Sequence, residues 1–295
     1  AELGFSSTGD VVTVSLLARR DTITDAVGLL GQLLREPTFP ESALDELKRQ
    51  ALSQLQTHRD DPEAIVENQL ARKGNPYSRG DPRYARSFDE QIEDAKAVTT
   101  DQLKAFHSRH YGAGQAQLAV VGDFDAPSLQ RALADAFGNW GAASPASRVA
   151  RPLYAVAAAR DVVRTPDKQN AALGVQLRWP VSENDAVYPA LAVANFILGY
   201  GGDSRLWKRI REREGLSYGV WSSVDWGDVD VHSVWSGTAI FAPGNGDKVE
   251  AAFREEVARA LRDGFTEAEV ISARQALLNF RRLARAQDER LAQGL

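Results

Sequence analysis

The sequence predicts an α+β fold, and three observations lead to that class. The chain has 295 residues, 43% of them hydrophobic, which is enough to bury one large core or two cores of about 150 residues. Predicted helices come in consecutive pairs, and the predicted strands over residues 217–226 and 233–241 are neighbours suited to antiparallel pairing. A segment of the first half also reappears in the second half. These features favour α+β layers over a doubly wound parallel sheet.

The first half of the chain opens on a strand and continues mainly as helices. Residues 11–19 are rich in β-branched side chains, and Thr22 to Asp25 has the pattern of a capping box at a helix start. A second such pattern runs from Thr99 to Gln102. Helices are predicted over residues 23–34, 41–58, 99–110 and 127–137, with a polar helix after Pro62 and a strand over residues 115–121.

The second half follows a stretch with the composition of a linker, residues 141–152, which is rich in Ala, Ser and Pro. Beyond it, strands are predicted over residues 160–164, 172–179, 217–226 and 233–241, and helices over 188–198, 204–214, 247–262 and 266–290.

An internal repeat sets the predicted domain organisation. Residues 12–55 resemble residues 237–280, since both run strand, acidic turn, helix, a short turn ending in Phe, and a second helix. Phe39 aligns with Phe265, an offset of 226 residues. Two copies of one domain are therefore predicted, with residues 1–145 the later part of the first and residues 146–295 the earlier part of the second. Chance similarity between two common strand-helix-helix units is the alternative.

Composition and charge exclude several functions. The net charge of −5 offers no basic footprint for nucleic acid, and no apolar run approaches the length of a membrane helix. With no cysteine, the chain has no disulfide, thiolate nucleophile or cysteine-bound zinc. This composition fits the periplasm or the cytoplasm, with the periplasm favoured, and its Ala and Arg content suggests a bacterial source.

Two short motifs have simple structural explanations. Residues 199–202, Gly-Tyr-Gly-Gly, precede a helix, but Asp203 and Ser204 stand where a phosphate loop needs other residues, so a helix-to-helix turn is predicted. His107 and His110 are spaced to share a metal on one helix face. Neither has a carboxylate or a third histidine at a diagnostic spacing, so a solvated helix end is expected.

The predicted helix over residues 204–214 is strongly basic. Its cations are Arg205, Lys208, Arg209, Arg211 and Arg213. Such a helix is often only a solvated surface. Tyr218, however, follows Arg211 by seven residues at the start of a strand, and arginine and tyrosine can both donate hydrogen bonds to peptide carbonyl oxygens. A site that holds an extended chain is the second interpretation.

These residues resemble a known family. The stretch IREREGLSYGV at residues 210–220, preceded by GGDSRL, is similar to the second-domain signature of the pitrilysin and insulinase type of zinc peptidase. Further similarity lies at residues 61–62, 75–77, 120–123 and 165–169. That family includes the mitochondrial processing peptidases and the core subunits of respiratory complex III. The resemblance implies duplicated α+β domains, each a largely antiparallel sheet with helices packed on one face, paired around a peptide-enclosing chamber.

The resemblance also implies that this chain is not catalytic. Active members carry H-x-x-E-H and a later glutamate as the zinc site, with the first glutamate activating water. The chain contains no H-x-x-E-H, residues 53–56 read Ser-Gln-Leu-Gln where the later glutamate would stand, and residues 201–205 contain no histidine. We therefore expect no catalytic residue and no metal ligand in this chain, and zinc on a catalytic domain or partner.

The expected function is thus that of an inactive portion of a zinc metallopeptidase, without hydrolytic activity alone. Its partners would be the zinc-bearing half or subunit and a peptide substrate. By resemblance, Arg211 and Tyr218 would hold the substrate's carbonyl groups. The alternative is a purely structural or interaction module of the same fold. A phosphate-binding domain is disfavoured by the residues after the glycine pair.

Overall fold

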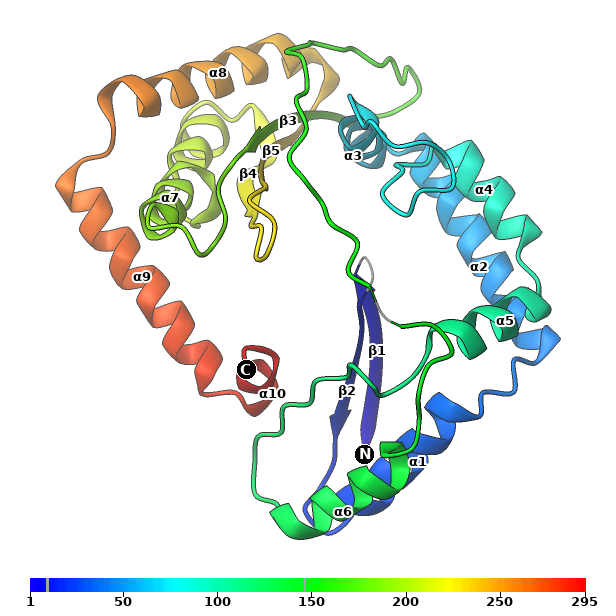
Figure 1. The fold of residues 1–295 in the computed structure, drawn as a ribbon. Helices are drawn as coiled ribbons and strands as arrows, with labels where there is room; N and C mark the ends of the chain where they lie inside the picture. Colours follow the sequence, from blue (N-terminus) through cyan, green and yellow to red (C-terminus); the bar gives the residue numbers. More distant parts are fainter. Residues whose placement is uncertain (9–10, 146) are drawn as a thin grey trace. The chain divides into compact units, whose positions relative to one another are not determined.

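The computed structural model, drawn in Figure 1, describes residues 1–8, 11–145 and 147–295. These residues group into two compact units. The first unit comprises Ala1–Ala51, Asp94–Val149 and Phe280–Leu295, and the second comprises Leu52–Glu93 and Ala150–Asn279. Residue 146, where the second predicted domain begins, lies outside the described residues. The division into residues 1–145 and 146–295 stays a prediction.

The first unit contains a hairpin and several helices. Strands β1 (Glu2–Thr8) and β2 (Val11–Leu17) pair antiparallel, with Phe5 opposite Val14. Helix α1 (Ile23–Arg35) packs against α6 (Ala126–Phe137). The two helices approach closely because residue 31 is a glycine, and a Cβ at this position would clash with Ala136. Helix α5 (Thr100–His110) and the short α10 (Asp288–Gln293) complete this unit.

The second unit is built on a three-stranded antiparallel sheet. Strands β3 (Ala171–Trp179), β4 (Ser217–Asp225) and β5 (Ser233–Phe241) lie in the order β3-β5-β4, so β5 is central (Figure 1). Alternate residues of β5 are buried, as expected for a strand with one face on the core. The core residues come from the sheet, from α8 (Gly246–Asp263) and from the basic segment: Leu206, Ile210, Val220, Trp235, Ala239, Phe241, Val249, Ala252 and Phe253.

Further helices and turns complete the described part of the chain. Helix α3 (Pro62–Arg72) contacts β3 at Gly174, where a Cβ would lie 2.2 Å from a methyl group of Val66. Helix α7 (Tyr188–Asn195) continues as a π-helical turn, Phe196–Tyr200. The other elements are α2 (Glu41–Asp60), α4 (Phe88–Ala97), α9 (Glu267–Arg285) and a 3₁₀ turn, Pro243–Asn245.

The α+β class and antiparallel pairing are confirmed, and most predicted elements are present. The predicted strands over residues 115–121 and 160–164 are wrong, because neither segment pairs with a strand among the described residues. A β-rich sequence forms a strand only where a partner supplies hydrogen bonds. Thr99 forms the predicted capping box with Gln102, whereas the hydroxyl of Thr22 donates to the Arg19 carbonyl and caps no helix.

The order of elements matches the predicted repeat. In the first half, β2 is followed by α1 and α2, and in the second half, β5 is followed by α8 and α9. Each leading strand also forms an antiparallel hairpin with the strand before it. The two stretches therefore share topology as well as sequence pattern.

Candidate functional site

The basic segment, residues 204–214, forms a wide helical turn rather than the regular helix predicted for it. After Ser204, whose hydroxyl accepts a 3.4 Å hydrogen bond from the Trp207 amide, the chain is π-helical over Trp207–Arg213. Leu206 and Ile210 are fully buried and fix the segment on the core. Such π-helical turns are rare and occur frequently at functional sites, so the cations beside this one need individual attention.

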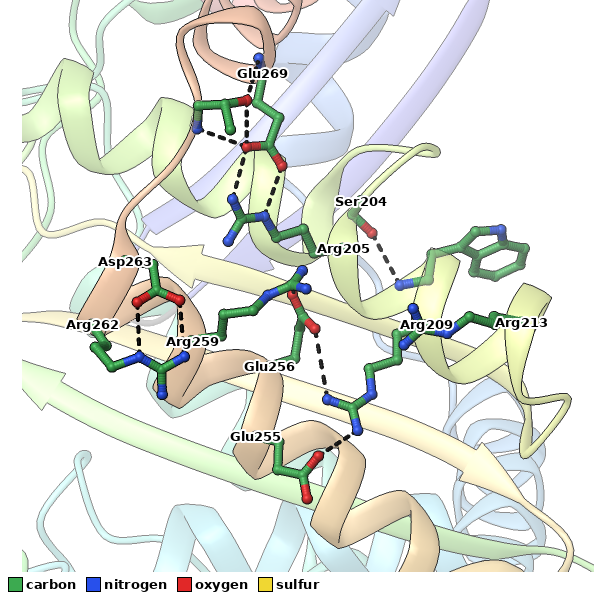
Figure 2. A network of polar contacts seen from close by, with 12 residues as sticks. Ser204, Arg205, Arg209, Arg213, Glu255, Glu256, Arg259, Arg262, Asp263 and Glu269 are labelled. Atoms are coloured by element: carbon green, nitrogen blue, oxygen red, sulfur yellow. Dashed lines mark hydrogen bonds and ion pairs between the residues drawn. The ribbon is translucent and has the colours of Figure 1, made fainter.

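Arg205 forms a two-pronged ion pair with Glu269 of α9 (Figure 2). Its Nε and Nη2 atoms each lie 2.7 Å from a carboxylate oxygen, and its guanidinium lies 4.7 Å from the centre of the Phe265 ring. The hydrogen bonds from Arg205, together with one from the Thr266 amide, lower the pKa of Glu269 to about 2 against an opposing effect of burial. Arg205 therefore anchors the segment to α9.

Arg209 anchors the same segment to α8 (Figure 2). Its Nε donates to Glu214 at 3.0 Å and its Nη2 to Glu255 at 2.5 Å. Its Nη1 lies 3.8 Å from Glu256, a carboxylate that is 1% exposed and also pairs with Arg259. Because a buried carboxylate is stable only when paired, Arg209 has a structural role here.

Arg211 differs from the other cations of the segment. Lys208 pairs with Asp203 at 3.0 Å and Arg213 lies 3.5 Å from Glu214. Within the described ranges, no carboxylate pairs with Arg211. Its Nε instead donates to the backbone carbonyl of Tyr218 at 3.2 Å, and its guanidinium lies 5.8 Å from the Trp207 ring centre.

Tyr218 occupies a β-bulge at the start of β4. Its neighbours Ser217 and Gly219 pair with consecutive residues of β5, Phe241 and Ile240, so Tyr218 itself has no partner across the ladder. The side chain is 62% exposed. Bulges at sheet edges re-aim side chains, and this one presents the phenol to solvent. The structure thus brings together the two residues selected from the sequence, through the Tyr218 backbone.

Sequence reasoning missed the role of Ser217, and it placed Gly199 in a turn without showing why a glycine stands there. Ser217 is 4% exposed, and its hydroxyl binds backbone groups around the bulge. Gly199 lies against Ser222 of β4, where a Cβ would be 2.7 Å from the Ser222 amide nitrogen. No local pattern singled out Ser217, because its neighbours Leu216 and Tyr218 do not show that its hydroxyl is buried and needs a hydrogen-bond partner.

The described residues do not fit a zinc site. No three His, Asp or Glu side chains among them gather in a way that could hold a metal ion. His107, expected at a solvated helix end, is half-buried, and its Nε2 lies 2.7 Å from the Leu34 carbonyl oxygen. It also borders an open apolar cavity of about 240 Å³ in the first unit, beside Phe39 and Phe106.

In the described part of the chain, no helix is long and apolar enough to cross a membrane.

Solved structures with a similar fold include several bacterial proteins. A peptidase M16 inactive domain from Pseudomonas fluorescens aligns with a TM-score of 0.75 and 23% identity, over 94% of this chain and 66% of that one. A protease from Helicobacter pylori aligns with a TM-score of 0.80 and 14% identity, over 99% of this chain and 70% of that one. By its fold, the chain is of the same α+β class as these peptidase-type domains.

The chain belongs to the family described as the peptidase M16 inactive domain, whose model matches residues 97–277, more than half of the chain. An uncharacterized zinc protease of Streptomyces coelicolor is 25% identical over 252 residues, covering 83% of this chain and 53% of that protein. A second uncharacterized zinc protease, from Mycobacterium leprae, is 29% identical over 210 residues, covering 67% of this chain and 44% of that protein. The chain spans about half the length of the curated relatives it matches. The family resemblance inferred from the sequence is confirmed.

Proposed function

We propose that this chain is a non-catalytic portion of a zinc metallopeptidase that forms half of a peptide-enclosing chamber. In this proposal Arg211 and Tyr218 hold carbonyl groups of the peptide and stabilise the oxyanion that develops during hydrolysis. Zinc, and the carboxylate that activates water, belong to the catalytic half or to a partner subunit. The chain alone hydrolyses nothing.

The observation that carries the proposal is the state of Arg211. The other four cations of the basic segment pair with carboxylates, whereas Arg211 lies against the bulge that exposes Tyr218. A guanidinium has five N–H donors, and only its Nε donates to the Tyr218 carbonyl. Its other donors and the phenol hydroxyl are of the kind that bind peptide carbonyls.

The sheet of the second unit supports a role as a chamber wall. One face is covered by α8 and the basic segment. The opposite face is covered by α3 at Gly174 of β3, and it carries a row of polar side chains from paired residues: Gln176, Ser236 and Ser223. Trp221 pairs with Thr238 in the next row and is 37% exposed. Hydroxyls, an amide and an exposed indole provide the hydrogen bonds and apolar contact that an extended peptide needs.

The test uses the full-length protein, or its complex with the zinc-bearing subunit, and an internally quenched peptide that it cleaves. Tyr218→Phe removes only a hydroxyl, and Arg211→Ala removes the guanidinium. Each should lower kcat/KM by about 10²-fold, the effect of losing one oxyanion donor. Arg213→Ala is the matched control, because Arg213 lies on the same turn and pairs with Glu214. It should leave cleavage nearly unchanged.

Unaltered kinetics in both the Tyr218→Phe and Arg211→Ala proteins would contradict the proposal. That result would favour the alternative, a structural or interaction module in which these residues only pack and bind neighbouring groups. Circular dichroism and unfolding of each variant establish that a loss of cleavage does not come from a loss of folding.

A further inference from the structure

The hydroxyl of Ser217 lies at the centre of the bulge that exposes Tyr218. Its Oγ is 2.6 Å from the carbonyl oxygen of Gly219 and 2.7 Å from that of Ile240, and it accepts a 3.1 Å hydrogen bond from the Gly219 amide. The residue is 4% exposed, so water has little access to replace these contacts. One hydroxyl thus bridges β4 to itself and to β5.

Other side chains hold the neighbouring carbonyls of this turn. The Asn245 amide donates to the Leu216 carbonyl at 3.0 Å, and Arg211 donates to the Tyr218 carbonyl at 3.2 Å. With Ser217 bound to Gly219, the carbonyls of residues 216, 218 and 219 all lie within reach of side-chain donors. The start of β4 is therefore shaped by side chains as well as by the sheet ladder.

The bulge determines where Tyr218 points. In a regular strand, successive side chains alternate between the two faces of the sheet. Without the one unpaired residue of the bulge, the side chains before it would therefore point to the opposite face. Here Ser217 faces the core while Val220, three residues on, is also buried, and Tyr218 between them is exposed. That spacing is possible only with the extra residue that the bulge accommodates.

We infer that Ser217 is a positioning residue for the peptide-binding pair, a step that rests on the proposed function. The Ser217 hydroxyl stabilises the bulge, and the bulge exposes the Tyr218 phenol. The Tyr218 carbonyl, in turn, accepts a hydrogen bond from Arg211. Ser217 touches no substrate and acts only through these two residues. Among the described residues, Ser217 is the side chain that binds the Gly219 amide and carbonyl, and no second side chain makes a hydrogen bond to either group.

The test compares Ser217→Ala and Ser217→Thr in the full-length protein or its complex. Ser222→Ala is the matched control, since Ser222 is a fully buried serine of the same strand whose hydroxyl binds Asn195, away from the bulge. The first measurement is amide hydrogen exchange at Gly219. Ser217→Ala should speed exchange there at least about tenfold, because the amide loses its acceptor, and Ser217→Thr and Ser222→Ala should not.

The second measurement is cleavage of the internally quenched peptide. Ser217→Ala should lower kcat/KM, and adding it to a variant that already carries Tyr218→Phe and Arg211→Ala should cause no further loss, since Ser217 acts only through those two residues. Ser217→Thr, which keeps the hydroxyl, should restore cleavage. A purely structural serine would instead add its own loss to that of the variant carrying both Tyr218→Phe and Arg211→Ala.

The outcomes separate this inference from the proposed function. If Tyr218→Phe impairs cleavage and Ser217→Ala does not, the inference is wrong and the proposed function stands. If neither Tyr218→Phe nor Arg211→Ala has an effect, the proposed function fails, and exchange at Gly219 alone decides whether Ser217 holds the bulge. Unchanged exchange in Ser217→Ala overturns the inference in either case.

Discussion

The side chains of the basic segment differ in role although they look alike in sequence. Arg205 and Arg209 are 12% and 19% exposed and bind carboxylates of α9 and α8 (Figure 2). Arg211 and Arg213 are exposed, and only Arg213 has a carboxylate beside it. Burial and partner, rather than residue type, therefore assign two arginines to stability and set apart Arg211, the cation that we propose binds the peptide.

The ion pair between Arg205 and Glu269 should make stability depend on pH. The pKa of Glu269 is about 2 in the folded chain, below its ordinary value near 4.5, because Arg205 and Thr266 bind the ionised form. A lowered carboxyl pKa stabilises the fold above the unfolded pKa, and this contribution is lost as the pH falls from about 4.5 towards 2.

Glu269→Gln should therefore cost about 1–2 kcal/mol of unfolding free energy at pH 6, less than for a fully buried pair because Glu269 is 31% exposed. The difference from the unmodified protein should shrink as the pH is lowered to 3. Urea unfolding at a series of pH values measures it. Glu267→Gln, on the same turn of α9, is the control, and an equal cost for both variants would contradict the role of the ion pair.

At the scale of elements, close packing between α8 and β5 holds the sheet that carries Tyr218. Gly237 of β5 lies against the ring of Phe253, where an added Cβ would be 2.3 Å from the ring atom Cζ. Phe253 is 2% exposed and packs beside Trp235, so its ring has no free space to move into. Residue 237 must be a glycine because α8 approaches β5 too closely for a larger side chain.

Gly237→Ala should lower the free energy of unfolding by about 1–3 kcal/mol, the usual cost of overpacking a core. Gly244→Ala is the control, because no atom lies within 4 Å of its added Cβ, and it should change stability by less than about 0.5 kcal/mol. Denaturant unfolding followed by tryptophan fluorescence compares them. Equal stability of the two variants would show that α8 can shift away from β5.

At the scale of the whole molecule, the chain spans about half the length of the curated relatives that it matches. The match to the M16 inactive-domain family covers residues 97–277, and the curated relatives named as zinc proteases are about twice as long as the region of similarity. The metal chemistry in those names needs ligands that the described residues do not bring together. The proposed separation between a zinc-bearing half and this chain is therefore open to direct measurement.

Metal analysis tests that separation. The purified chain should bind far less than one zinc ion per molecule, because isolated histidines without a second and third ligand bind zinc weakly. The full-length protein or complex should bind zinc and lose peptide cleavage on chelation, and zinc should restore it. Stoichiometric zinc on the isolated chain would overturn the assignment of the metal to another domain or subunit.

Several features of the site were predictable and several were not. Arg211 and Tyr218 stood out because a basic run met a strand at a family-like motif. The structure has Arg211 on a helical segment and Tyr218 at the start of β4, and their role as a peptide-binding pair stays a prediction. The distinction among five cations was not predictable, since the partners Glu255 and Glu269 lie some 46 to 64 residues further along the chain. The bulge at Tyr218 was not predictable either, because it depends on the register in which β4 pairs with β5.

The sequence by itself determined the α+β class, the repeated strand-helix-helix order, the lack of cysteine chemistry and the family. These follow from periodicity, composition and local motifs, which act over a few residues. Only the tertiary structure decided that residues 115–121 and 160–164 are not strands, that Arg205 and Arg209 are anchors, and that Ser217 shapes the turn beneath Tyr218. The physical reason is that strand pairing, ion pairing and burial depend on groups brought together from distant positions.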